Sequence, residues 1–164
     1  MRRTLEGLSL CALVDMGWTT WRAFHGRVAL PDRIPTHFDV SGQPNGWGSP
    51  ASLLLLPCIA VFVYVLLTVV SLFPSSFNYP VRVTAQNRDR LQGIALSMMA
   101  WVKAELCCLF ALIQLLTIAA ARIGRLGMSP FMVPLAIVIV FVTIGAHFIA
   151  MGRAYTRAGE SVGG

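Results

Sequence analysis

The chain has 164 residues, of which 56% are hydrophobic and 12% are charged, and its mean hydropathy is +0.70. Soluble domains carry about 25% charged residues, so this composition excludes an ordinary soluble protein and indicates an integral membrane protein with one membrane domain, residues 1–164. The net charge of +6 does not indicate a nucleic-acid partner. Basic residues separated by apolar stretches are typical of contact with membrane lipids.

The first predicted element is a helix over about residues 5–24. Asp15 lies near its middle, where insertion scales assign a carboxylate a cost of about 2.5–3.5 kcal/mol. The apolar run at its start is short and no small-residue cleavage site follows, so we expect an uncleaved membrane helix rather than a signal peptide. Trp18 and Trp21 at its far end are typical of interfacial anchors.

Three further apolar stretches follow, and each exceeds the roughly 20 residues that cross a bilayer as a helix. They predict spans at about residues 51–73, 97–121 and 131–151, and a helical surface segment at 87–96 leads into the span at 97–121. The sequence therefore predicts an all-α integral membrane protein with about four transmembrane helices.

The basic residues give the orientation. An arrangement with the N-terminus inside puts seven of them inside: Arg2, Arg3, Arg82, Arg88, Arg90, Arg153 and Arg157. Five lie outside: Arg22, Arg27, Arg33, Arg122 and Arg125. This bias favours both termini inside, which makes residues 30–50 a structured external loop.

The 30–50 loop is the segment richest in functional signals. Its four prolines restrain the backbone, residues 36–40 alternate as a short strand would, and Asn45-Gly46 is a strong turn dipeptide. A small hairpin that carries Trp47 at the headgroup level is expected. Two interpretations remain open: an interfacial cap that closes the bundle, or a recognition surface that offers His37, Asp39, Asp32 and Arg33 to a ligand.

Neither a metal site nor catalysis is expected. The spacing of His25, Asp32, His37 and Asp39 matches no recognised ligand pattern, and the chain has neither a nucleophile elbow nor a phosphate-binding glycine loop. The cysteines all lie within predicted spans and are expected to pack as small apolar residues: Cys11, Cys58, Cys107 and Cys108. The chain is therefore predicted to be no enzyme and to need no cofactor.

The run LPDRIPTHFDVSGQPNGWGSP, followed by LLLLPCI, resembles the bacterial membrane family known as domain of unknown function 1648. The resemblance covers about residues 18–64, and its pattern falls on Leu30, Pro31, Ile34, Pro35, His37, Phe38, Gly42, Pro44, Trp47 and Gly48. It implies a multi-pass protein of the bacterial cytoplasmic membrane. The binding residues that it indicates, with Asp39 added, are Pro31, Pro35, His37, Phe38, Asp39, Gly42, Pro44 and Trp47.

This family includes the Sdp immunity proteins, which protect a cell from its own secreted toxic peptide. The resemblance thus implies a role in toxin immunity or envelope signalling. Those proteins carry a further membrane region with a Gly/Arg/Trp motif, which has no counterpart here after Val81. The architecture of helices around an external loop is what the resemblance transfers best.

Polar residues also occur inside the predicted spans: Asp15, Lys103, Glu105, Gln114 and His147. Such residues usually face the bundle interior. Lys103 and Glu105 point about 200° apart on a helix, so we expect Lys103 to extend to the inner headgroups and Glu105 to meet His147. Asp15 is expected to pair with Arg22. These residues either join the helices by hydrogen bonds or form a proton or ion relay.

Two functional hypotheses follow. In the first, the external loop binds a peptide or protein partner of the envelope. In the second, several copies assemble into a small transporter or channel that uses Asp15, Glu105 and His147. The expected partners are membrane lipids, a peptide or protein at the loop, and further copies of the chain.

Overall fold

The computed structural model describes residues 1–123 and 129–160, with side chains for 1–123 and 129–156, and it is mostly helical. Arg125 lies outside the described residues, as does the side chain of Arg157. The elements in chain order are α1 (Arg2–His25), β1 (Ile34–Phe38), β2 (Pro44–Gly48), η1 (Pro50–Leu54), α2 (Leu55–Val70), η2 (Pro74–Ser76), α3 (Arg88–Ile123) and α4 (Met132–Glu160).

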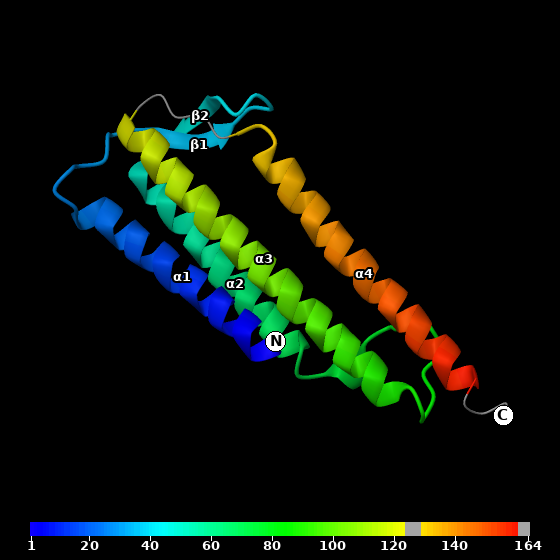
Figure 1. Cartoon of the computed structure of the whole chain (residues 1–164). Helices are drawn as coiled ribbons and strands as arrows, with labels where there is room; N and C mark the ends of the chain where they lie inside the picture. The colour runs from blue at the N-terminus through cyan, green and yellow to red at the C-terminus, as the bar shows by residue number, and fades with distance from the viewer. Residues whose placement is uncertain (124–128, 161–164) are drawn as a thin grey trace.

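Helix α3 is the centre of the bundle. Helices α1 and α2 pack against it and against each other, whereas α4 packs against α3 on another side (Figure 1). The interface of α1 is a single stripe at helical spacing, made of Leu5, Ser9, Ala12, Met16, Thr20 and Ala23. Opposite it, α3 presents mainly alanines, and small residues allow helix backbones to approach closely in membrane proteins.

Three segments are long and apolar enough to cross a membrane: Pro50–Val70, Arg88–Ile123 and Met132–Thr156. Two begin close to their predicted starts, and the third incorporates the predicted surface segment 87–96 into one continuous helix. Helix α1 is not among them, because its charged residues lower its hydropathy. None of residues 131–150 is buried, so α4 leaves most of its apolar surface to the surroundings.

Strands β1 and β2 form an antiparallel hairpin at the end of the bundle opposite both termini (Figure 1). Ile34 pairs with Gly48, Pro35 with Trp47, and Phe38 with Pro44, with irregular register around His37. The strands thus cover Ile34–Phe38 rather than the predicted 36–40.

The predicted turn at Asn45-Gly46 is wrong, because both residues lie inside β2. The chain reverses instead between Asp39 and Gln43, where the Asp39 N–H donates to the Gln43 carbonyl oxygen at 2.8 Å. Side-chain capping by Asp39 within this turn supplies bonds that the Asn-Gly dipeptide would not.

The opposite end of the bundle has its own apolar cluster. Leu91 and Ala95 of α3 pack with Met151 and Ala154 of α4, and the connection between α2 and α3 covers them with Phe77, Tyr79 and Val81. Both ends of α3 are therefore held by packing, which fixes the hairpin relative to the rest of the bundle.

Candidate functional site: the hairpin and the polar layers beneath it

The base of the hairpin is embedded in the bundle. Ile34 is fully buried among Ala23 of α1, Leu53 of η1, and Ile118 and Ala121 of α3. Burial of an isoleucine side chain contributes about 1.5–3 kcal/mol. The hairpin is consequently anchored in the bundle at its base, whereas Val40 in its turn is 97% exposed.

Asp39 organises the turn. One of its carboxylate oxygens, Oδ1, accepts hydrogen bonds from the Ser41 hydroxyl (2.6 Å), the Ser41 N–H (2.8 Å) and the Gln43 N–H (2.9 Å). The Ser41 hydroxyl bond, and after it the Gln43 N–H bond, hold the pKa of Asp39 below its ordinary value of 3.8. Gly42 follows at φ 81°, a conformation that glycine adopts without steric cost.

His37 and Asn45 face each other across the two strands. The Nδ1 atom of His37 contacts the Oδ1 atom of Asn45, and because an amide oxygen only accepts, Nδ1 is the donor. A Cβ atom at Gly46 would lie 2.8 Å from the Cβ of His37. The glycine is therefore required for the close approach that positions the imidazole.

A hollow of about 540 Å³ separates the hairpin from the start of α4. From the hairpin it is lined by His37, Phe38, Asp39, Val40, Gly42 and Asn45. From the other side it is lined by Ser129, Pro130, Val133 and Pro134. Its volume falls within the roughly 300–1,000 Å³ of small-molecule sites, and Val40 at its rim is 97% exposed.

The remaining loop residues lie elsewhere on the hairpin. Pro35 is buried at the base and Pro44 is half-buried in β2, whereas Trp47 is 48% exposed opposite Pro35. Pro31 is exposed in the segment before β1. The predicted binding set thus divides into residues that support the hairpin and residues that face the hollow.

His25 is not part of this site. Its ring stacks on Trp21 with centroids 5.2 Å apart, and its Nδ1–H donates to the Trp21 carbonyl oxygen at 3.0 Å. Asp32 and Arg33 are exposed ahead of β1. Within residues 1–123 and 129–156, no three His, Cys, Asp or Glu side chains are close enough together to hold a metal ion.

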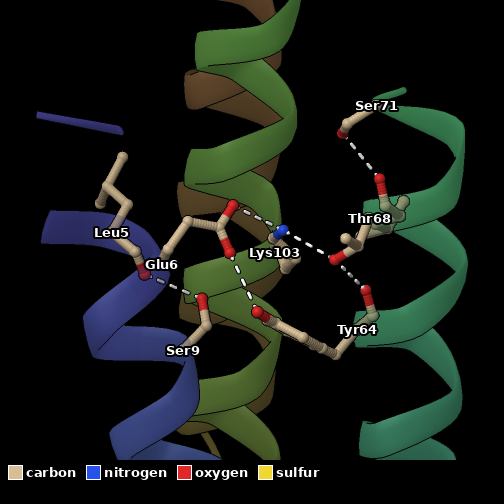
Figure 2. A network of polar contacts seen from close by, with 8 residues as sticks. Leu5, Glu6, Ser9, Tyr64, Thr68, Ser71 and Lys103 are labelled. Carbon is tan, nitrogen blue, oxygen red and sulfur yellow. Dashed lines mark hydrogen bonds and ion pairs between the residues drawn. The ribbon is translucent and has the colours of Figure 1, made fainter. Parts of the chain in front are cut away.

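Below the hairpin, towards the end with the termini, a polar layer joins α1, α2 and α3 (Figure 2). Lys103 is 2% exposed, and its Nζ lies 2.6 Å from Glu6 Oε1 and donates to Thr68 Oγ1 at 3.0 Å. Tyr64 donates to Glu6 Oε2 at 3.1 Å and places its ring 4.7 Å from the ammonium. The expectation that Lys103 extends to the headgroups is wrong, because Glu6 supplies a charge partner within the bundle.

A second polar layer lies nearer the hairpin. Gln114 is 1% exposed, and its Nε2 donates to Thr20 Oγ1 (2.7 Å) and to the Leu53 carbonyl oxygen (3.0 Å). Because Lys103 and Gln114 are eleven residues apart, or about three helical turns, both face the same side of α3. These two layers join the helices as interhelical hydrogen bonds do.

Glu105 lies on the other side of α3 and meets α4. Its Oε1 accepts a hydrogen bond from the Thr143 hydroxyl, and its Oε2 is buried without a partner among the described residues. His147 does not bond to Glu105 as expected, since its Nδ1–H donates to the Thr143 carbonyl oxygen at 2.7 Å. Thr143, one turn earlier on α4, takes the expected place of the histidine.

Asp15 does not face the bundle. It is exposed on α1, about 100° from Met16 in the packed stripe, and no ion pair joins it to Arg22 in the described residues. Because the stripe of α1 contains serine and threonine rather than carboxylate, the expectation that Asp15 points inward is wrong. Its exposed side chain adds to the cost of placing α1 in lipid.

Sequence reasoning missed four residues that make these layers: Glu6, Tyr64, Thr68 and Thr20. Glu6 is a charged residue at the edge of the predicted helix over residues 5–24. The available signal was its position beside Leu5 and Ser9, which belong to the packed stripe of α1. A carboxylate at the edge of a packed helix face can reach a buried cation on the neighbouring helix.

Comparison with known proteins addresses the hairpin and its two flanking helices. Residues 16–61 match the family described as Domain of unknown function (DUF1648). This segment belongs to that family. It runs from Met16 in α1 through both strands to Val61 in α2, so the DUF1648 segment is the hairpin with the helices that support it. No curated protein and no solved structure matches the chain.

Proposed function

We propose that the hairpin is a recognition element that binds a peptide or protein partner of the cell envelope. The observation that carries this proposal is the hollow between the hairpin and α4, which combines polar groups from His37, Asp39 and Asn45 with apolar surface from Phe38 and Val133. Sites that combine apolar lining with a few fixed polar groups are typical of ligand recognition.

Binding rather than catalysis fits these groups. Asp39 Oδ1 is occupied by the turn, and His37 Nδ1 is engaged by Asn45, which leaves Nε2 of the neutral ring as an acceptor. An acceptor beside exposed apolar residues suits a peptide, since peptide groups offer N–H donors and apolar side chains together.

The proposal places the hairpin outside a bacterial cytoplasmic membrane, on a bundle of four spanning helices. With 24 residues, α1 is about 36 Å long, which is sufficient for a bilayer core of about 30 Å. The polar groups of its packed stripe are bonded, as in Thr20. The excess of basic residues at the end with the termini supports an outside hairpin.

The resemblance of residues 30–50 to the DUF1648 family, which includes the Sdp immunity proteins, supports one further step. A rigid external hairpin attached to three helices is suited to bind a secreted toxic peptide or to signal its presence. In this role the polar layers at Lys103 and Gln114 hold the hairpin on its support rather than carry ions.

The test is in-cell photo-crosslinking from p-benzoylphenylalanine at Val40, which is 97% exposed at the rim of the hollow. Mass spectrometry of the adducts is expected to identify one discrete peptide or protein. The same probe at Leu72, which is 68% exposed and follows the far end of α2, serves as the matched control and is expected not to give that adduct.

The substitution His37→Ala is expected to abolish the adduct without changing membrane abundance. His25→Ala, which removes an exposed histidine outside the hollow, is expected to leave it unchanged. Adducts to lipid alone, or to further copies of the chain alone, would show that the hairpin is a cap or a self-contact and would overturn the proposal.

A further inference from the structure

A second hollow lies between α3 and α4 and is lined by no hairpin residue. It has a volume of about 330 Å³, and its walls are apolar side chains except at Glu105. Residues 131–150 of the α4 side contain no buried side chain, so the groove is accessible from outside the bundle. Both helices are long and apolar enough to cross a membrane, so the groove opens into the hydrocarbon region.

Glu105 is incompletely satisfied at this position. Its Oε1 accepts from Thr143, but its buried Oε2 has no hydrogen-bond partner in the described part of the chain. It is the one buried side-chain oxygen or nitrogen there in this condition. Leaving a buried polar atom unbonded costs about 1–3 kcal/mol, and carboxyl groups within membrane spans usually mark a functional site.

We propose that this groove binds an amphipathic organic cation. Its ammonium group pairs with the carboxyl group of Glu105, which lines the groove, and its apolar body lies along Leu109 and Leu112 of α3 and Leu135 and Ile139 of α4. Because Oε2 is buried in this structure, the carboxyl group turns about its terminal torsion to meet this donor, and the positive charge complements the carboxyl group. The volume fits the lower range of small-molecule sites, about 300–1,000 Å³.

Among the side chains of residues 1–123 and 129–156, no lysine or arginine forms an ion pair with Glu105. Lys103 is engaged by Glu6, and among the described helices the arginines lie near helix ends. Arg153, the nearest along α4, is ten residues beyond Thr143, or about 15 Å along the axis. A second copy docked on α4 would therefore bring apolar side chains to the groove but no donor to Glu105, and an anionic lipid headgroup would meet a carboxyl group of like charge.

The test uses the full-length protein in nanodiscs and a pair of fluorescent probes. Dansylcadaverine carries a primary ammonium on an apolar body, and its N-acetyl derivative has the same body without the charge. The wild-type protein is expected to bind the first at least tenfold more tightly than the second, because a hydrogen bond to a charged group contributes about a factor of ten or more.

Glu105→Gln keeps an acceptor for Thr143 and is expected to weaken dansylcadaverine binding about tenfold or more. Ala136→Phe fills the groove from α4 without touching Glu105 and is expected to block both probes. Asp15→Asn removes an exposed carboxyl group of α1 and is expected to change neither affinity.

Equal affinity of the wild-type protein for the two probes overturns the proposal. This comparison needs no substituted protein, so its result does not depend on whether a variant folds. Unchanged affinity in a monodisperse Glu105→Gln protein also overturns it. Because the groove and the hairpin hollow share no residue, failure here leaves the hairpin proposal intact, and the converse also holds.

Discussion

The ion pair between Glu6 and Lys103 offers the sharpest test of the bundle, because one partner is buried and the other is half-exposed. Lys103 is 2% exposed and the Glu6 side chain is 38% exposed. Breaking a fully buried pair by removing one partner costs about 3–5 kcal/mol. The two substitutions should therefore differ in cost, since they leave different charges behind.

In Glu6→Gln the ammonium of Lys103 stays buried without its counter-charge. It keeps the Thr68 hydroxyl at 3.0 Å and the Tyr64 ring at 4.7 Å, and a desolvated cation–π contact contributes about 2 kcal/mol. We therefore expect a loss of about 2–3 kcal/mol in the free energy of unfolding. Lys103→Met leaves Glu6, which reaches water, and should cost about 1 kcal/mol.

The double variant should cost about 1 kcal/mol, so the coupling energy between the two sites is expected to have a magnitude of about 2–3 kcal/mol. The free energies come from reversible unfolding in mixed micelles, with helix content followed by circular dichroism as the proportion of dodecyl sulfate rises. Asp15→Asn, on the exposed side of α1, is the control and should stay within about 0.5 kcal/mol of the parent.

A coupling energy below about 0.5 kcal/mol would refute the reasoning, as would a Glu6→Gln variant no less stable than Asp15→Asn. Either result would mean that Lys103 reaches water or lipid headgroups when the chain is in a membrane. The predicted extension of this lysine to the headgroups would then be restored.

Two further predictions concern the turn and the upper polar layer. The hydrogen bonds of the turn lower the pKa of Asp39 in the folded hairpin. The ionised carboxylate therefore stabilises the turn at pH values above 3.8, and this contribution is lost as the pH falls through the lowered pKa. In an NMR pH series, the chemical shift of the Gln43 amide proton should titrate with a midpoint below 3.8. Gln114→Leu removes the donors to Thr20 and the Leu53 carbonyl oxygen and should lower the free energy of unfolding in micelles by about 0.6–1.7 kcal/mol.

A specific result would contradict each of the predictions for Asp39 and Gln114. A titration midpoint at or above 3.8 would mean that the turn does not hold the carboxylate, and Asp39→Ala should in any case remove the titration. For the upper layer, Gln92→Leu changes a half-buried glutamine on the same helix. If both glutamine variants lost the same free energy, the loss would reflect helix α3 generally rather than the bonds of Gln114.

Much of the helical framework follows from the sequence. Uninterrupted apolar runs and their lengths predict the helices near 51–73, 97–121 and 131–151, because hydrocarbon requires every backbone group to be bonded within the segment. The density of proline and glycine in residues 30–50 similarly indicates an ordered loop. Where that loop turns was predicted wrongly, since Asp39 caps the turn through its side chain and its advantage over Asn45-Gly46 depends on the bonds it finds there.

The pairing of polar side chains was decided only by the tertiary structure. Helical periodicity alone sets Lys103 and Glu105 on opposite sides of α3, but it does not say which helix lies on each side. Packing α1 on one side brings Glu6 to Lys103, and packing α4 on the other brings Thr143, rather than His147, to Glu105. Hydropathy is a property of consecutive residues, so it can be calculated from the sequence. The hydrogen-bond and ion-pair partners of a polar side chain depend on how neighbouring helices are rotated and shifted along their axes, and only the assembled bundle determines this.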